Sequence, residues 1–396
     1  MDIKWIRKDM DLNKIVDNNT VINIQNSGIL EIDFYAYARS FFEAANLVVK
    51  HLLTEAAKTH DIAKLDLWYF ALIYLYRQSL ELLIKANIFQ LEQNDANRKD
   101  IIGRVRHDLK QGFDKIIKLT NTDINANANL VWLNDFLEDI SKIDRESDMF
   151  RYPFGSNLRV LFDKQTHISL EATYYNFNRA FDILKTLYNT HNFSDEEYQK
   201  EVQYDPKLII EGGDYYYQSV VGYKYAERAF YPYYTSYEEC ASFLKDIIIN
   251  EGKTNLFMPM CYLYRNSIEL GLKRLIVEDS HLGSEKALRT IKRKKHSIKG
   301  LWNSIVDELK THVQDGDDTL DVALNYIDAF HNMDITSDKF RYPCNKELET
   351  YFLTGANIDV KNFGDCFSEL IAFLDGADGL LAQIKEFEAE MAANYR

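Results

Sequence analysis

Residues 74–85 read Tyr-Leu-Tyr-Arg-Gln-Ser-Leu-Glu-Leu-Leu-Ile-Lys, and residues 262–273 read Tyr-Leu-Tyr-Arg-Asn-Ser-Ile-Glu-Leu-Gly-Leu-Lys. The two stretches are identical at eight of twelve positions, at an offset of 188 residues. Apolar residues surround a polar row at helical spacing, so each stretch predicts a helix that is buried on most of its faces. A match of this length within one chain indicates an internal duplication.

The duplication extends beyond these two stretches. His107-Asp108-Leu109-Lys110 corresponds to His296-Ser297-Ile298-Lys299. Residues 147–153 (Ser-Asp-Met-Phe-Arg-Tyr-Pro) correspond to residues 337–343 (Ser-Asp-Lys-Phe-Arg-Tyr-Pro), and the offset changes only from 188 to 190. These matches predict an N-terminal extension at 1–33, a first bundle at 34–189, a connector at 190–229 and a second bundle at 230–396.

The predicted fold class is all-α. In the first copy, apolar residues recur at helical spacing over 41–53, 65–89, 107–119, 128–143 and 174–188. The second copy repeats this pattern, so we expect two tandem helical bundles of four or five helices each, related by the duplication.

Two smaller features precede the first polar helix. Upstream of it the offset is 196, which gives the first copy about eight extra residues, and we expect them in a loop around 56–64. At the N-terminus, residues 21–24 and 29–32 flank Asn26-Ser27-Gly28. This pattern predicts a short hairpin.

Composition narrows the class of protein. Of 396 residues, 46% are hydrophobic and only 5 are proline, as in an ordinary helical globular protein. Residues 67–89 form the most apolar stretch, but charges interrupt it, and the first residues lack the apolar core of a secretory signal. We therefore expect a cytoplasmic protein that does not enter the membrane. The four cysteines lack CxxC spacing, and no phosphate loop, HExxH, GxSxG or GxGxxG motif occurs, so neither a metal nor a cofactor is predicted.

Arg77, Glu81 and Lys85 lie at i, i+4 and i+8, on one face of an otherwise apolar helix. One interpretation is a buried polar latch, in which Arg77 and Glu81 pair with each other and with the Ser-Asp-x-Phe-Arg-Tyr-Pro segment. The latch residues are then Glu81, Asp148, Arg151, Glu269, Asp338 and Arg341. The alternative is a cleft that binds a phosphate or another anion through Arg77, Lys85, Arg265 and Lys273.

His107 and His296 are the only histidines at corresponding positions, and each follows an arginine, Arg104 or Arg293, by three residues. Residues 286–299 hold seven Lys or Arg and no acidic residue, in a chain with a net charge of −14. This local positive run predicts phosphate or nucleic-acid contacts through Lys292, Lys294 and Lys295. The alternative is a solvated run of charges without a ligand.

The polar helix, the following His-x-Leu/Ile-Lys and the later Phe-Arg-Tyr-Pro resemble the HEPN-like all-α domains of many bacterial proteins. The resemblance covers about residues 34–188 and 230–384. It implies helical bundles that dimerise, so a tandem copy is expected to form an intramolecular pseudo-dimer. It also implies a role in phage-defence or toxin-antitoxin systems, in which many members are metal-independent ribonucleases. Active members carry Arg and His with four to six residues between them, whereas Arg104 and Arg293 precede their histidines with two between.

Three hypotheses for function follow. The first is a tandem HEPN-like protein that binds RNA, another nucleic acid or a protein partner. The second is a metal-independent ribonuclease using Arg104 with His107 and Arg293 with His296, in which histidine takes the 2′-hydroxyl proton and arginine stabilises charge on the phosphate. The third is a structural or regulatory scaffold. The copies also differ, because Gly271 stands where the first copy has Leu83, and this predicts closer helix contact or extra space in the second copy.

Overall fold

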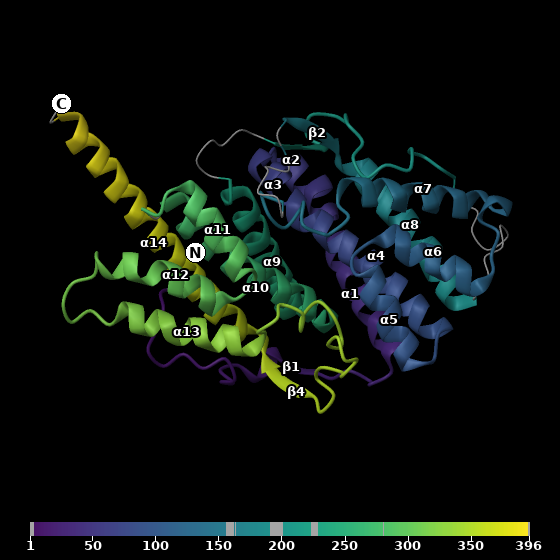
Figure 1. Ribbon diagram of the computed structural model, residues 1–396, viewed down its shortest axis with the longest axis horizontal. Helices are drawn as coiled ribbons and strands as arrows, with labels where there is room; N and C mark the ends of the chain where they lie inside the picture. Colours follow the sequence, from purple (N-terminus) through teal and green to yellow (C-terminus); the bar gives the residue numbers. More distant parts are fainter. Residues whose placement is uncertain are drawn as a thin grey trace.

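The chain folds into a mostly helical protein, seen in a computed structural model that describes residues 4–155, 162, 164–190, 201–222, 229–279 and 281–394. Figure 1 shows two groups of helices that meet along four long central helices, α1, α4, α9 and α10. We call α1 to α8 the N-terminal half and α9 to α14 the C-terminal half. The predicted all-α class is confirmed as a predominantly helical fold.

Within its described residues, the N-terminal half contains eight α-helices and two short irregular helices. Its α-helices are α1 (Leu30–His51), α2 (Ala57–Thr59), α3 (Ile62–Leu67), α4 (Tyr69–Leu91), α5 (Asp95–Val105), α6 (Leu109–Thr120), α7 (Ala128–Ile143) and α8 (Leu170–Thr190). A π-helix, η2 (Leu52–Ala56), follows α1, and a 3-10 helix, η3 (Ile124–Ala126), precedes α7. The helix predicted over 128–143 coincides with α7.

The described part of the C-terminal half contains six α-helices. They are α9 (Tyr231–Glu251), α10 (Phe257–Arg274), α11 (Ser284–Lys294), α12 (Ile298–Lys310), α13 (Thr319–Met333) and α14 (Val360–Asn394). The 3-10 helix η4 (Thr254–Leu256) leads into α10, and the π-helix η5 (Leu275–Asp279) follows it. Helix α14 is the longest, and its end extends beyond the other helices in Figure 1.

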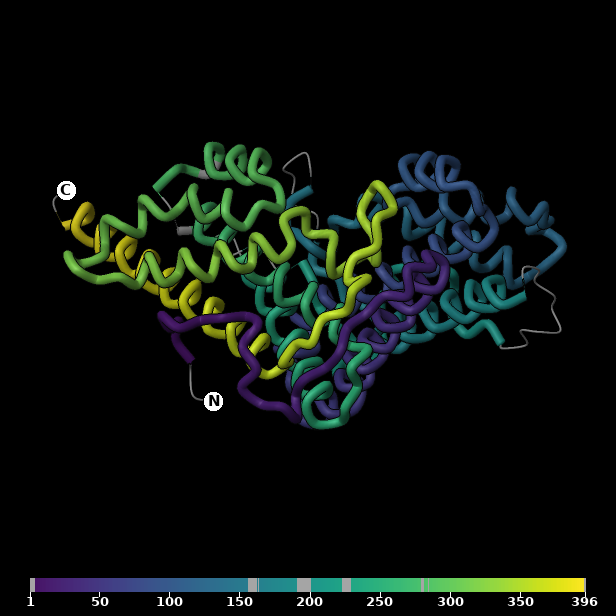
Figure 2. The backbone as a smooth tube through the Cα atoms, turned by 90° about the horizontal axis from the view of Figure 1, so that it is seen from below, coloured from purple at the N-terminus to yellow at the C-terminus, as the bar shows by residue number. Residues whose placement is uncertain are grey.

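Two short antiparallel sheets join segments that are distant in sequence. Strand β1 (Val21–Ile24), which follows the 3-10 helix η1 (Asn18–Thr20), pairs with β4 (Ala356–Asp359). Strand β2 (Thr166–Ser169) pairs with β3 (Gln218–Val221). The N-terminal segment therefore lies along the C-terminal half, as Figure 2 shows, and an Arg7–Glu369 ion pair of 3.0 Å also holds it there.

The predicted N-terminal hairpin is wrong. Residues 21–24 form a strand, but their partner is β4, and residues 30–32 already belong to α1. The cause is Asp33, whose carboxylate accepts hydrogen bonds from the main-chain N–H groups of Ser27 and Gly28, at 2.8 and 2.9 Å. These bonds make the Asn26-Ser27-Gly28 turn the lead-in to a helix, because a carboxylate in the first helical turn satisfies donors there.

The extra residues of the N-terminal half, expected in a loop around 56–64, are largely helical. The chain between α1 and α4 passes through η2, α2 and α3, with a single left-handed residue, His60, at φ 58°. Helix α3 is capped by Asp61 and contacts β3. The matching connection in the C-terminal half is the short turn at Gly252 followed by η4.

Helices α4 and α10 lie at the centre of the molecule. In α4 the residues from Tyr69 to Phe89 are all buried, and in α10 every residue is buried. Each helix packs within its own half and also against the other half, α4 against α9 and α10 against α1. Among the described residues, no helix is both long and apolar enough to cross a membrane.

Candidate functional site

Helix α4 carries a row of charged side chains that is almost fully buried. The Glu81 carboxylate accepts hydrogen bonds from Lys85 Nζ at 2.6 Å and from Arg77 Nη1 at 3.2 Å, so Arg77 and Glu81 pair as expected. Burial alone would raise the pKa of Glu81, but Lys85, His107 and Arg77 hold that pKa well below its usual range. The carboxylate is therefore ionised, because the cations around it stabilise its charged form.

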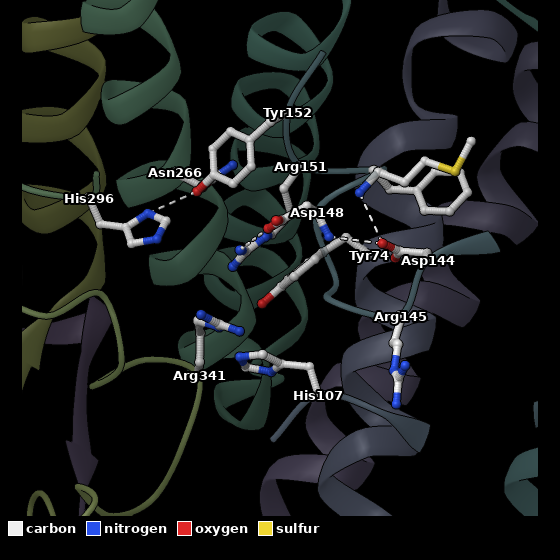
Figure 3. Close-up of polar contacts among 12 residues, drawn as sticks. Tyr74, His107, Asp144, Arg145, Asp148, Arg151, Tyr152, Asn266, His296 and Arg341 are labelled. Carbon is white, nitrogen blue, oxygen red and sulfur yellow. Dashed lines mark hydrogen bonds and ion pairs between the residues drawn. The ribbon is translucent and has the colours of Figure 1, made fainter. Parts of the chain in front are cut away.

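Arg77 connects α4 to two other segments of the N-terminal half. Its guanidinium pairs with the Asp144 carboxylate at 3.1 Å and donates to the main-chain carbonyl of His107 at 2.7 Å. It also donates to the main-chain carbonyls of Asp144 and Arg145. Asp144 in turn accepts the main-chain N–H of Asp148, at 2.8 Å (Figure 3). Arg77 thereby fixes the segment before α6 and the segment after α7.

The C-terminal half repeats this arrangement on α10. Glu269 accepts a hydrogen bond from Arg265 and one of 2.7 Å from Lys273 Nζ. Arg265 donates to the main-chain carbonyl of His296 at 2.5 Å and lies 3.8 Å from the Asp334 carboxylate. Burial lowers the pKa of Lys273, although Glu269 raises it. The four cations Arg77, Lys85, Arg265 and Lys273 are thus directed at carboxylates, and not at solvent as a phosphate cleft would need.

Each half receives a tyrosine from the other half. Tyr342, which follows α13, donates a hydrogen bond of 2.6 Å to Glu81 of the N-terminal half. Tyr152, which follows α7, donates a hydrogen bond of 2.9 Å to Glu269 of the C-terminal half. The Phe-Arg-Tyr-Pro segments are therefore exchanged between the halves, and each completes the polar cluster of the opposite half.

The expected latch places the Phe-Arg-Tyr-Pro segment of a copy on the glutamate of that same copy, and the structure differs on this point. We call the contact region between the two halves, around the Phe-Arg-Tyr-Pro segments, the junction. Two tyrosines of α9 bind the segment of the N-terminal half across it. Tyr233 donates to the main-chain carbonyl of Met149, and Tyr237 donates to that of Phe150, both at 3.1 Å. Asp148 pairs with Arg151 at 2.9 Å and does not contact Glu81, because Tyr152 and Arg151 lie at the junction of the halves.

His107 and His296 contact the two glutamates through Nδ1. The distances are 3.1 Å from His107 to Glu81 and 3.0 Å from His296 to Glu269. The glutamate raises the pKa of each histidine, but burial and nearby cations outweigh it, so both pKa values lie below the ordinary 6.5. The side chains are 31% and 38% exposed, so both imidazoles reach solvent although their partners are buried.

The residue before each histidine has an unusual main-chain conformation. Arg106 has φ 48° and ψ −105°, and Lys295 has φ 52° and ψ −112°. Such conformations are costly for residues other than glycine and persist only where surrounding contacts enforce them. Here the enforcing contact is the hydrogen bond from Arg77 or Arg265 to the carbonyl of the histidine that follows.

Arg151 and Arg341 lie at the centre of the junction. They flank a stacked pair of rings, Tyr74 of α4 and Tyr262 of α10, whose centroids are 4.6 Å apart. Arg341 lies close enough to His107 to lower its pKa, and Figure 3 shows its guanidinium directed toward that ring. Arg341 donates to the Tyr342 hydroxyl at 3.1 Å, and no ion pair joins it to Asp338 in the part of the chain that the structure describes.

The structure does not bring together the arginine and histidine of the two Arg-x-x-His motifs. Arg104 is 73% exposed and pairs with Asp100 of the same helix at 2.9 Å. Arg293 lies on the exposed surface of α11, and within the described residues no hydrogen bond or ion pair joins it to His296. The cations on the surface beside it are Lys292, Lys294 and Lys295, of which Lys294 is half-buried.

Four residues of the site were not identified from the sequence. Tyr152 and Tyr342 bind the glutamates, and Asp144 and Asp334 lie beside Arg77 and Arg265. A signal for them was present, because the tyrosines recur in both Phe-Arg-Tyr-Pro segments and the aspartates match at the offset of 190. The four cysteines are free and buried, as a packing role requires.

Comparison with known protein families, with curated proteins and with solved structures finds no match to this chain. The geometry of the junction is therefore the basis for its chemistry. Two partly exposed imidazoles, each held by a buried carboxylate, have the arrangement of a general base. The cations around them favour an anionic ligand.

Proposed function

We propose that this protein is a tandem HEPN-like protein that binds RNA at the junction of its halves. In this proposal the halves arose by duplication and form an intramolecular pseudo-dimer. Supporting this, Glu81 and Glu269 have the same set of partners, with the tyrosine of each set coming from the opposite half. The resemblance further supports a cytoplasmic component of a bacterial phage-defence or toxin-type system.

The observation that carries the proposal is the surface leading to each histidine. Exposed Arg104 and Arg106 precede His107, and the run 292–295 precedes His296. A phosphodiester backbone that contacts either surface run would pass directly beside a solvent-facing imidazole. Positive surface runs bind phosphates even in a chain of net charge −14, because screening confines the interaction to within about 10 Å.

RNA binding is tested by fluorescence anisotropy with a labelled single-stranded RNA over a range of salt concentrations. A variant with Lys292, Lys294 and Lys295 changed to Gln should bind more weakly and show a shallower salt dependence. A variant with Lys142, Lys207 and Lys310 changed to Gln removes the same charge from exposed lysines elsewhere and serves as the control. Equal binding by the two variants would argue against this surface, and no binding by the wild type would leave the scaffold hypothesis.

A second candidate is a metal-independent ribonuclease, and the state of the two histidines favours it. Both pKa values lie below 6.5, so both rings are largely neutral at pH 7. If Nδ1–H donates to the glutamate, the Nε2 lone pair is available to accept a proton. Nε2 would then take the proton of a ribose 2′-hydroxyl as its oxygen attacks the adjacent phosphorus. A 2′,3′-cyclic phosphate forms, and the displaced 5′-oxygen leaves with a proton from water.

Cleavage is tested by incubating the protein with total RNA in EDTA, beside His107→Ala, His296→Ala and the double variant. Loss of cleavage in the double variant, with circular dichroism unchanged, would support the ribonuclease. His281→Ala is the matched control, because His281 is exposed and lies outside the junction. Cleavage that persists in the double variant would exclude these histidines as the base.

A further inference from the structure

Arg341 is a buried cation without an acidic partner. It is 5% exposed, and among the described residues no carboxylate lies within ion-pair distance of its guanidinium. Its Nε atom has no hydrogen-bond partner at all. Buried arginines are ordinarily paired, because removing an unpaired charge from water is costly.

Arg151 occupies the equivalent place in the other Phe-Arg-Tyr-Pro segment. It is 4% exposed, and its Nε atom also lacks a hydrogen-bond partner. Among the described residues its ion pair is with Asp148, whose side chain is 35% exposed. The junction therefore contains two guanidinium groups whose hydrogen-bonding capacity is used only in part, because the Nε donor of each is unpartnered among the described residues.

The surroundings of the two arginines compensate only in part. Their guanidinium carbons lie over tyrosine rings, Arg341 at 5.6 Å from Tyr262 and Arg151 at 6.0 Å from Tyr74. Each also lies 5.0 Å from the ring of the adjacent tyrosine, Tyr342 or Tyr152. These contacts stabilise the buried charges but leave the Nε donors without a partner. The two guanidinium groups carry like charges in one buried region, as Figure 3 shows. An anion that contacts both would offset their repulsion.

Each arginine lies beside one of the solvent-facing histidines. Arg341 lowers the pKa of His107, and Arg151 lowers that of His296. Figure 3 shows the two arginines and the two histidines in one region, around the Tyr74 side chain. Both imidazoles are partly exposed, so this region borders solvent at the two histidines.

We propose that Arg151 and Arg341 form an anion site on the junction that takes the phosphate group of a nucleotide or of a nucleic-acid backbone. A phosphate suits this site because its oxygens can accept several N–H groups at once, in the geometry that guanidinium forks present. Glu81 and Glu269 do not serve as the anionic partners of these arginines, because Lys85, Lys273 and the tyrosines already bind their carboxylates. The assignment of RNA as the phosphate source rests on the proposed function, whereas the anion site itself does not.

The site is tested on the full chain by thermal unfolding and calorimetry with inorganic phosphate, pyrophosphate and a single-stranded RNA. Wild type should gain thermal stability with pyrophosphate, beyond the effect of chloride at equal ionic strength. Arg341→Met should retain the stability of the ligand-free wild type, since it removes an unpaired charge, and should bind pyrophosphate at least tenfold more weakly. Arg341→Lys keeps the charge but loses the fork, so its affinity should lie between the two.

The matched control is Arg274→Met. Arg274 is also 5% exposed, but it pairs with Asp378 and lies outside the junction. This control should unfold more readily without ligand and keep the full response to pyrophosphate. If Arg341→Met instead loses stability like Arg274→Met and responds fully to pyrophosphate, Arg341 is structural and the anion site is refuted.

Comparing pyrophosphate binding with RNA binding distinguishes the anion site from the proposed RNA-binding function. Pyrophosphate binding that depends on Arg341, without any RNA binding, would support the anion site with a small phosphate ligand and refute the RNA proposal. RNA binding that is unchanged in the Arg151→Met/Arg341→Met double variant would refute the anion site and leave RNA binding to the surface lysines. RNA and pyrophosphate that compete for one site, both weakened by the double variant, would support both.

Discussion

The hydroxyl of Tyr342 donates a 2.6 Å hydrogen bond to the carboxylate of Glu81, 261 residues earlier in the chain. Because the tyrosine follows α13 and the glutamate lies on α4, this bond joins the two halves at a buried carboxylate. Its counterpart joins Tyr152 to Glu269. The reciprocal pair makes the polar clusters of the two halves dependent on each other.

Tyr342→Phe should lower the free energy of unfolding by about 1.5–3 kcal/mol, as expected for a buried hydrogen bond to a charged group. Tyr342 is 8% exposed, so water cannot readily replace the lost donor. Urea unfolding measures the change, and Tyr152→Phe should behave alike. Tyr215→Phe, at a side chain that is 61% exposed, should change stability by less than about 0.5 kcal/mol. A Tyr342→Phe variant as stable as this control would show that the exchanged bond contributes nothing.

Glu81→Gln should destabilise the protein by about 3–5 kcal/mol, because it leaves Lys85 and Arg77 buried with less compensating charge. The same change at Glu269 should have a similar effect. Glu138→Gln is the control: Glu138 also pairs with a lysine four residues away, but both side chains are solvent-exposed. Exposed pairs of this kind contribute less than about 1 kcal/mol. Equal urea midpoints for the two variants would contradict the burial argument.

The stability of the protein should fall as the pH drops below about 6.5, in part through His107 and His296. Their pKa values in the folded state lie below the ordinary 6.5, so the unfolded chain binds more protons in this range. The contribution is fully present above pH 6.5 and is lost as the pH falls toward the folded pKa. In the His107→Gln/His296→Gln variant, the slope of stability between about pH 7.5 and 5.5 should be smaller.

His281 provides a control of opposite sign. Glu388 and Glu308 raise its pKa above 6.5, so its contribution is present below pH 6.5 and is lost as the pH rises. His281→Gln should therefore make the slope steeper, where the double variant makes it shallower. Urea unfolding at several pH values measures both. Parallel slopes in all three proteins would mean that other groups dominate this pH range.

The sequence predicted the helices of the fold well and the contacts of its termini poorly. The periodicity of 128–143 marks α7 correctly, because an amphipathic helix in a bundle needs apolar residues at every turn. The strand at 21–24 was recognisable, but its partner 356–359 lies more than 300 residues away, and local patterns carry no information about such pairing. Asp33 decided the rest, since its bonds to Ser27 and Gly28 favour a helix start over a hairpin.

The site could be predicted in its residues but not in its connections. The spacing of Arg77, Glu81 and Lys85 indicates their mutual pairs, because side chains four residues apart on a helix are neighbours. Spacing within one copy cannot show that Tyr342 of the other half reaches Glu81. The exchange depends on how α4 and α9 pack, which is a tertiary property. The motif at Arg104 and His107 suggested a pair, but His107 Nδ1 contacts Glu81 after the positive φ of Arg106, whereas Arg104 pairs with Asp100 on the surface.

Gly271→Ala should destabilise the protein although alanine is the better helix former. A Cβ atom at this position of α10 would lie 3.0 Å from Cε2 of Tyr234 and 3.1 Å from Cδ1 of Leu374, so both neighbours must shift. Overpacking of this kind costs about 1–3 kcal/mol, and the gain of up to about 1 kcal/mol in helix propensity offsets it only in part. Urea unfolding should therefore show a net loss.

Gly103→Ala is the matched change in the other half. Gly103 lies in α5, and its Cβ would meet nothing within 4 Å, so the variant should gain about 0.5–1 kcal/mol. Opposite signs for the two variants would show that the Tyr234 ring fills the space beside α10. In the sequence alignment of the two halves, Leu83 and Ala38 stand where the C-terminal half has Gly271 and Tyr234. One half combines a large residue on the polar helix with a small one on the preceding helix, and the other half does the reverse. A change at one of the two positions alone would therefore leave a cavity or an overpacked contact.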